Sequence, residues 1–267
     1  MSYRAKRENA GLEAELARLE AQAALSWVAE ARRLRGLGLP ERPRILELGA
    51  GPGCVTTRLH DLFPGCTITA LDDDEDMLEV ARARCAGRLG ITLTRADAAA
   101  TGLAEASFDL VLSRYLFQHL ARPDLVAAEA LRVLRAGGVH AVIDIDDELW
   151  GLAEPRFPAL QAIHAKASAS QTGAGRNRRV GRALRSILDD AGYADAALDV
   201  FCYGSDWLGL EPFGAQMDPA RLLPLLRDKS LSMSDYLAAQ AMTDAFTATP
   251  GARVLLIGFI GTGRRPS

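Results

Sequence analysis

The sequence predicts an α/β protein with a doubly wound, mostly parallel sheet of seven strands, an N-terminal helix and helical lid insertions. Two observations carry this prediction. Short apolar segments alternate with helical segments from residue 44 to residue 145. The apolar segments are nearly continuous, which indicates strands that helices cover on both faces of a parallel sheet.

The first predicted element is an N-terminal helix from Ala5 to about Arg35, because apolar residues recur there at helical spacing. Gly36, Gly38 and Pro40 end this helix. The alternation that follows predicts strands at 44–48, 67–71, 91–95, 108–113 and 139–145, with helices at 53–62, 76–84 and 123–134.

The pattern is less regular after residue 150. The stretch 150–175 contains prolines and glycines around a helical middle. Asn177 is predicted to cap a helix that ends at Gly192. A sixth strand at 198–203, short helices at 219–227 and 233–247, and a final strand at 253–260 complete the chain.

Composition and charge exclude several classes of protein. The net charge is -3, with signs mixed along the chain, so there is no basic footprint for nucleic acid. The four cysteines form no C-x-x-C pair and are expected to be reduced thiols. A charged N-terminus and no long apolar run predict a cytoplasmic protein with no membrane partner. The sequence leaves the oligomeric state open, a homo-oligomer included.

A glycine-rich loop follows the first predicted strand, with Gly49, Gly51 and Gly53 in a G-x-G-x-G spacing. Glycines at the carboxyl end of a strand let the backbone turn sharply and approach a bound nucleoside closely. A dinucleotide fold requires G-x-G-x-x-G, and its last place is Cys54 here. No Tyr is followed by a Lys four residues later, as a short-chain dehydrogenase requires. The loop therefore indicates a nucleoside cofactor other than NAD.

Three further motifs follow the loop. Asp72 ends the second strand about twenty residues later, where an acidic side chain can accept hydrogen bonds from both ribose hydroxyls. Residues 95–98 follow the third strand, and residues 108–113 form the fourth. With these motifs in this order, the stretch 44–145 resembles the class I S-adenosylmethionine-dependent methyltransferases, in particular the small-molecule and natural-product enzymes related to the ubiquinone/menaquinone methyltransferases.

This resemblance implies S-adenosyl-L-methionine as the cofactor and a small-molecule acceptor, methylated on O, N or C. It implies a helical segment at 1–40 and a methyltransferase domain at 41–267, with insertions near 150–177 and 206–250. The family's sheet ends in an antiparallel strand, which corresponds to 253–260. Together with residues 1–36, the insertions are expected to cover the site and form the acceptor pocket.

The resemblance also implies a role for each residue of the motifs. Asp73 stands where many relatives have an apolar residue against adenine, so Met77 is either that contact or an ordinary core residue. The other implied roles are ordering of the loop (Glu47), passage under the methionine and ribose (Gly49, Ala50, Gly51, Gly53), ribose binding (Asp72), adenine binding (Asp97, Ala98) and proximity to the methionine end (Ser113, Arg114).

The acceptor is expected at the ends of strands four and five, where parallel sheets of this kind bind ligands. His119 is the candidate general base if the acceptor atom is oxygen or nitrogen, and a structural histidine is the alternative. His140 and His164 are weaker candidates. Asp144 and Asp146 are expected on one face of strand five, or bonded to loop amides.

An arginine cluster surrounds the start of the helix that ends at Gly192, where positive charge is unfavourable. Either internal acids and solvent balance it, or it binds an anionic group of the substrate. Its members are Arg176, Arg178, Arg179 and Arg182.

Three other functions fit the sequence less well. A methyltransferase acting on exocyclic base amines has N-P-P-Y where residues 113–116 read S-R-Y-L. A catechol-type enzyme needs carboxylates around Mg²⁺, and apart from Asp144 and Asp146 that pattern is missing, so we expect no metal. A non-catalytic scaffold would not need the intact set of cofactor motifs.

Overall fold

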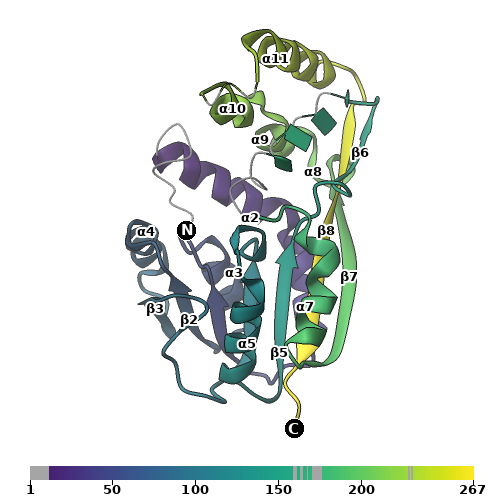
Figure 1. Ribbon diagram of the computed structural model, residues 1–267. Helices are drawn as coiled ribbons and strands as arrows, with labels where there is room; N and C mark the ends of the chain where they lie inside the picture. The colour runs from purple at the N-terminus through teal and green to yellow at the C-terminus, as the bar shows by residue number, and fades with distance from the viewer. Residues whose placement is uncertain are drawn as a thin grey trace.

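The computed structural model describes residues 12–158, 161–162, 165–166, 168–169, 176–227, 229 and 231–267. The predicted helical residues 5–11 and the candidate His164 lie outside the described residues. The structure is a mixed α/β protein around one sheet (Figure 1), so the predicted fold class is confirmed.

The sheet has the strand order β3-β2-β1-β4-β5-β8-β6, and β7 also pairs with β8. The first five strands are parallel, and β8 is antiparallel to β5, β6 and β7. The bounds are β1 Arg44–Leu48, β2 Thr67–Asp72, β3 Ile91–Arg95, β4 Phe108–Arg114, β5 Leu134–Asp144, β6 Gly151–Glu154, β7 Ala194–Gly204 and β8 Arg253–Arg264.

β5 begins at Leu134, before its predicted start at residue 139, and two features of the sheet topology also differ from the prediction. The antiparallel strand β8 lies inside the sheet between β5 and β7, not at its end. An eighth strand, β6, pairs with β8 within the stretch predicted as an insertion. Its four residues, Gly-Leu-Ala-Glu, form too short a run to give a strand signal in the sequence.

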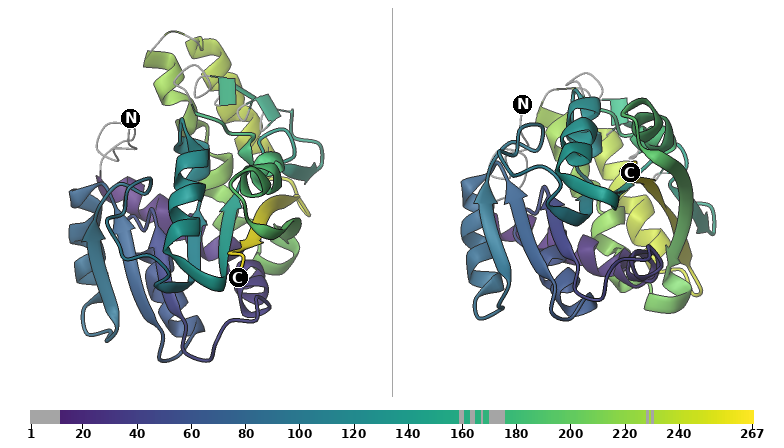
Figure 2. Two further views of the ribbon diagram at one scale, coloured as in Figure 1. Left: turned by 60° about the horizontal axis from the view of Figure 1, so that its bottom comes forward. Right: turned by 90° about the horizontal axis from the view of Figure 1, so that it is seen from below.

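Helices cover both faces of the sheet (Figure 2). On one face, α2 (Leu12–Arg35) and α3 (Cys54–Leu62) pack with β1 and β4 in one apolar cluster, and α4 (Glu75–Cys85) lies beside α3. On the other face, α5 (Pro123–Val133) and α7 (Leu184–Asp190) form a second cluster. No helix in the described part of the chain combines the length and apolarity needed to cross a bilayer.

The region before α7 differs from the expected helix start. Asn177 Oδ1 accepts a hydrogen bond from the Arg179 amide, and the chain then forms a 3-10 turn, η2 (Val180–Ala183), before α7. Asn177 therefore closes a turn and does not cap the α-helix itself. A second 3-10 turn, η1 (Phe117–His119), follows β4.

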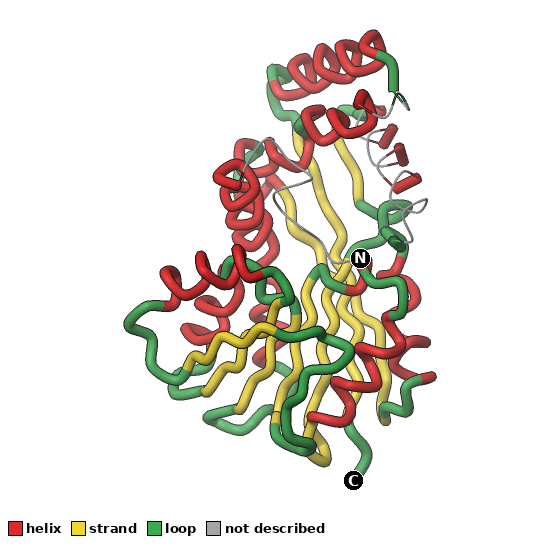
Figure 3. The backbone as a smooth tube through the Cα atoms, turned by 60° about the vertical axis from the view of Figure 1, so that its left-hand side comes forward, coloured by secondary structure: helices red, strands yellow, loops and turns green. Residues whose placement is uncertain are grey.

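Short helices between β7 and β8 form a cap, defined here as the described residues from Ser205 to Ala252. β8 pairs with β5 only as far as Phe259, opposite Asp144, so residues 253–258 extend past the carboxyl end of β5. These residues and the end of β7 carry the cap above the sheet (Figure 3). Its helices are α8 Ser205–Leu208, η3 Glu211–Phe213, α9 Gly214–Met217, η4 Pro219–Leu222, α10 Leu223–Arg227 and α11 Met233–Thr247.

The cap packs against α2 and the end of the sheet through its own apolar cluster. Leu25 of α2, Phe213 of η3 and Phe246 of α11 belong to this cluster, and the ring of Phe246 stacks on Phe157 with 4.6 Å between centroids. The cap therefore lies on the carboxyl side of the parallel strands, where ligands of such sheets bind.

Candidate active site

The glycine loop between β1 and α3 is held against the end of β2. The amides of Gly49 and Ala50 both donate to the Leu71 carbonyl, at 2.8 and 2.9 Å. Gly49, Gly51 and Gly53 all have a positive φ, of 73°, 53° and 76°, which glycine adopts without steric cost. The predicted glycines are therefore needed for the path of the loop.

These three glycines differ in what surrounds them. A Cβ at Gly49 would lie 3.2 Å from Leu116 Cδ1, and one at Gly53 would lie 3.2 Å from Ala81 Cβ. A Cβ at Gly51 would have no protein atom within 4 Å. The loop is thus packed at both ends and has open space at its middle glycine, which suits the close approach of a nucleoside cofactor.

Asp72 fixes this middle part of the loop. Its Oδ2 accepts from the Gly51 amide at 2.7 Å, and its Oδ1 accepts from the Asp74 amide at 2.9 Å. Burial raises the pKa of Asp72. Each carboxylate oxygen has a second lone pair, so Asp72 can also accept hydrogen bonds from a ribose.

Glu47 lies beneath the loop and is 2% exposed. Its Oε2 accepts from the Thr56 hydroxyl of α3 at 2.6 Å. Burial raises the pKa of Glu47 to about 7. The contact with Thr56 ties the end of β1 to the helix that follows the loop, in agreement with a role in ordering the loop.

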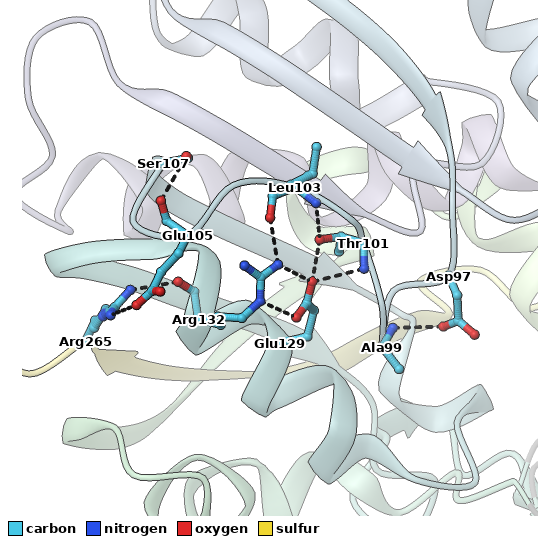
Figure 4. Close-up of polar contacts among 9 residues, drawn as sticks. All are labelled: Asp97, Ala99, Thr101, Leu103, Glu105, Ser107, Glu129, Arg132 and Arg265. Atoms are coloured by element: carbon cyan, nitrogen blue, oxygen red, sulfur yellow. Dashed lines mark hydrogen bonds and ion pairs between the residues drawn. The ribbon is translucent and has the colours of Figure 1, made fainter.

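Hydrogen bonds to α5 hold the segment that follows β3 (Figure 4). The amide and hydroxyl of Thr101 both donate to Glu129 of α5, which also pairs with Arg132. Asp97 is exposed, and its Oδ1 accepts from the Ala99 amide at 2.8 Å. Asp97 is therefore exposed just after the carboxyl end of β3, in a loop that hydrogen bonds join to α5.

The other residues expected near adenine differ in burial. Asp73 is exposed, and its carbonyl accepts from the Arg95 side chain. Met77 is 3% exposed within α4, which favours the interpretation as a core residue. Ala98 is half-buried and packs on the α5 side of the sheet.

The Ser113 side chain points away from the expected site, into the core. Its Oγ lies 3.0 Å from His140 Nε2, and His140 Nδ1 lies 2.9 Å from the Tyr193 hydroxyl. Tyr193 donates its hydrogen to the Ala127 carbonyl, so His140 donates through Nδ1 and accepts from Ser113. Only the backbone of Ser113 remains to contact a cofactor, and His140 is a core histidine.

Arg114 points to the opposite face, toward α2. Its Nε and Nη2 donate to the two oxygens of Glu30 at 2.8 and 3.0 Å, and Nη2 also donates to Ser26 at 3.0 Å. Both side chains of the pair are buried. Arg114 was expected next to the methionine end of the cofactor. Its guanidinium instead binds Glu30 and Ser26 of α2, so the expectation is corrected for this side chain.

The sequence motifs assign no specific role to Tyr115, and Tyr203 is one of several aromatic residues that suit either an acceptor pocket or an ordinary core. Tyr115 has a φ of 52°, an unusual left-handed conformation for an aromatic residue. Its ring lies 4.3 Å from the Arg114 guanidinium, and its hydroxyl interacts with Ser26 and Tyr203. Of the four described non-glycine residues with positive φ, only Tyr115 is not exposed. No sequence pattern predicts this, because tertiary contacts hold the backbone there.

His119 lies in η1, directly after β4. Burial, together with the positive charges of Arg176, Arg178 and Arg18, lowers the pKa of His119 to about 3. The ring is therefore neutral near pH 7, and a protonated imidazole is unfavourable there. Burial also lowers the pKa of His140 to about 3. An imidazole with so low a pKa is a weak base, so these surroundings do not favour His119 as the general base.

The arginine cluster is balanced internally for three of its members. Arg178 pairs with Asp147, Arg179 with Glu148, and Arg182 with Asp146 and Glu148. The interpretation as internal acid pairing is confirmed for these three. Asp146 lies beyond the end of β5, so it does not line the strand with Asp144 as expected.

Asp144 ends β5 in the interior of the protein. Its oxygens accept from the amides of Gln118 and Ile145 at 3.1 and 2.9 Å. Burial raises the pKa of Asp144 to about 7. Of the two expected roles, a place on one face of the strand or hydrogen bonds to loop amides, Asp144 has the second. It thereby holds η1 beside the end of β5.

Known proteins with similar sequences identify the family. Residues 46–142 match the family model described as a methyltransferase domain. The trans-aconitate 2-methyltransferase of Methylobacterium radiotolerans is 32% identical over 200 residues, which cover 67% of this chain and 73% of that protein. The chain belongs to the class I S-adenosylmethionine-dependent methyltransferases.

Other relatives of this methyltransferase match over shorter stretches. Malonyl-[acyl-carrier protein] O-methyltransferases of Methylococcus capsulatus and Geobacter sulfurreducens are 42% and 37% identical, over 39% and 52% of this chain. The matches span only 38% and 49% of those two proteins.

Solved structures agree with the fold. A Bacillus halodurans protein superposes with a TM-score of 0.57 at 19% identity, covering 90% of this methyltransferase and 98% of that chain. Phosphoethanolamine N-methyltransferase 2 of Haemonchus contortus gives 0.57 at 18% identity, over 90% and 53% of the two chains. The family and its cofactor, S-adenosyl-L-methionine, are those that the sequence motifs predicted.

Proposed function

We propose that this protein transfers a methyl group from S-adenosyl-L-methionine to a small-molecule acceptor, of the natural-product or secondary-metabolite kind, by in-line displacement. The observation that carries the proposal is the open space at Gly51, the middle glycine of a loop that is packed at both ends. The Gly51 amide donates to the carboxylate of Asp72, so the open space lies beside that carboxylate. The names of the relatives support methyl transfer to small or carrier-bound acceptors.

Each residue near the loop would then have a definite task. The Gly49–Gly53 loop, ordered by Glu47, would pass under the methionine and ribose. Asp72 would bind the ribose hydroxyls, and Asp97 with the Ala98 amide would bind the adenine. When bound, the cofactor supplies a methyl group that its sulfonium already makes electrophilic. The remaining task of the protein is to place the acceptor in line and to exclude water.

The acceptor would lie between the ends of β4 and β5 and the cap. Tyr115, His119 and the fixed turn η1 lie at that end of the sheet. The cap and α2 enclose the same side through the apolar cluster that contains Leu25 and Phe213. We propose that this enclosure excludes water and sets which acceptor fits.

Cofactor binding is tested by calorimetry with S-adenosyl-L-methionine, its demethylated product S-adenosyl-L-homocysteine, and NAD. We expect the first two to bind, one per chain, and NAD not to bind. Asp72→Ala should weaken the free energy of binding of S-adenosyl-L-methionine by about 1.5–3 kcal/mol, which is roughly a 10- to 150-fold loss of affinity. Glu79→Ala, an exposed acid on α4, is the matched control and should bind normally. Unchanged affinity in Asp72→Ala would remove that assignment.

Transfer itself is tested with a labelled methyl group and a panel of acceptors that includes trans-aconitate, malonyl thioesters, phenols and amines. We expect a labelled product in the presence of a chelator as much as without it. Loss of activity that Mg²⁺ restores would instead indicate a metal-dependent mechanism. Cofactor binding with no methylated product across a broad panel would favour a non-catalytic role.

A further inference from the structure

Two carboxylates beside the glycine loop lack a cationic partner. Glu47 hydrogen-bonds only to the neutral hydroxyl of Thr56, and Asp72 bonds only to backbone amides, among the contacts of the described residues. Arg114 is near enough to lower the pKa of Glu47, but its guanidinium is paired with Glu30, to which it donates at both carboxylate oxygens. When these two groups are ionised, the buried Glu47 and the half-buried Asp72 place negative charge beside the loop, and no Lys or Arg of the described residues forms an ion pair with either.

Such an arrangement is costly without a ligand. An ionised carboxylate that is removed from water and has no cation is destabilised, and it responds by taking up a proton. A cationic ligand reverses this, because an opposite charge nearby favours the ionised form. The geometry at Glu47 thus favours a ligand that brings positive charge to the loop.

The two ligands of a methyltransferase differ in charge at one atom. S-adenosyl-L-methionine carries a positive sulfonium, and S-adenosyl-L-homocysteine carries a neutral thioether at the same position. Their amino, carboxyl and nucleoside groups are identical. A buried carboxylate beside the site therefore acts differently on the cofactor and on the product.

On the basis of the proposed function, we propose that Glu47 is a specificity-determining residue: its ionised carboxylate favours the charged sulfonium cofactor over the neutral thioether product, and its protonated form removes that preference. Glu47 thereby helps the enzyme to release product and take up a new cofactor. It lies two residues before Gly49, on the strand that leads into the loop.

The groups that face Glu47 from each neighbouring element determine its response. These are Thr56 on α3, Arg114 on β4, Asp72 on β2 and Cys85 on α4. Thr56 and Arg114 lower the pKa of Glu47, Asp72 raises it, and burial outweighs them all, so the pKa lies near 7. Below pH 7, binding of the cationic cofactor should therefore release a proton from Glu47, whereas binding of the neutral product should not.

The test is calorimetry of both ligands at pH 6 and pH 7.5, in two buffers with different ionisation enthalpies. The ionised fraction of a group with a pKa of 7 rises from about 0.09 to about 0.76 between these pH values. The ratio of the product Kd to the cofactor Kd should rise with pH, by at most about eightfold, and binding of the cofactor at pH 6 should release up to one proton per molecule bound. Effects of the shared groups largely cancel in this ratio.

Glu47→Gln should make the ratio independent of pH, while the exposed control Glu79→Gln should behave like the wild type. Thr56→Val removes a hydrogen bond to the ionised form, so it should move the change in ratio to higher pH. If Glu47→Gln does not fold, the pH dependence of the Kd ratio in the wild type and in Thr56→Val still tests the inference. Binding of both ligands with a constant ratio and equal proton release would overturn this inference. Binding of neither ligand would instead contradict the proposed function.

Discussion

The guanidinium of Arg114 and the carboxylate of Glu30 form a two-bond ion pair that joins the end of β4 to α2. The Ser26 hydroxyl donates to the same carboxylate at 2.6 Å, one turn earlier in the helix. Both charged side chains are buried, at 8% and 0% exposure. This part of α2 is therefore held against the sheet by a buried ion pair and by apolar packing, as an integral part of the fold.

Breaking this pair should destabilise the protein strongly. Arg114→Ala leaves Glu30 buried without its cation, so we expect the free energy of unfolding to fall by about 3–5 kcal/mol. The double variant Arg114→Met with Glu30→Leu should lose less, because no charge remains unpaired. Chemical denaturation measures both. Arg122→Ala breaks an exposed pair with Asp124 and is the control; an equal loss in this control would contradict a special role of burial.

Gly51→Ala should separate cofactor binding from folding. The added methyl group meets no protein atom within 4 Å, so only the left-handed backbone is penalised, by about 1–2 kcal/mol. The same methyl group would occupy the open space over the loop, and we expect the affinity for S-adenosyl-L-methionine to fall more than tenfold. Gly87→Ala is the matched control, because Gly87 also has a positive φ and an open Cβ position. Normal affinity in Gly51→Ala would show that the cofactor does not approach this residue.

The low pKa of His119 leads to a kinetic prediction. With a pKa near 3, its ring stays neutral from pH 5 to 8, so the pH profile of kcat/KM should show no ionisation from His119 in that range. We expect His119→Gln to lower kcat less than tenfold on an oxygen or nitrogen acceptor. A drop of 100-fold or more with an unchanged melting temperature would re-establish His119 as the general base.

Hydrogen exchange with and without S-adenosyl-L-homocysteine should distinguish the covering segments. Glu20 pairs with Arg58 and Arg84, and Glu30 pairs with Arg114, so α2 from residue 20 onward should be protected in both states. The short helices of the cap, within 206–250, should gain protection when the ligand binds. Equal protection of the cap in both states would mean that it is fixed structure.

Much of the fold could be predicted from the sequence because it depends on local patterns. Continuous apolar runs gave the parallel strands, and glycine spacing gave a loop whose three glycines all have a positive φ. A helix was predicted at about 233–247, and α11 spans Met233–Thr247. β6 was missed because its four residues form a strand only through pairing with β8.

The directions of the side chains could not be read in this way. Ser113 and Arg114 are adjacent at the end of β4, yet one contacts His140 on the α5 side and the other contacts Glu30 on the α2 side. Both partners are distant in the sequence, so only the tertiary structure defines them. The same holds for Tyr115, whose backbone conformation depends on its contacts with Arg114, Ser26 and Tyr203.

The extension of β7 and β8 beyond the sheet has a consequence for how such an enzyme diversifies. The cap is inserted between Gly204 and Arg253, and each flanking strand continues into the central sheet with its pairing intact. Under the proposed function, the inserted helices can be lengthened, shortened or exchanged while the glycine loop, Asp72 and Glu47 keep their positions. Acceptor range and cofactor use can then evolve as separate traits, and a cap transplanted at these two residues is a direct route to a methyltransferase with a new acceptor.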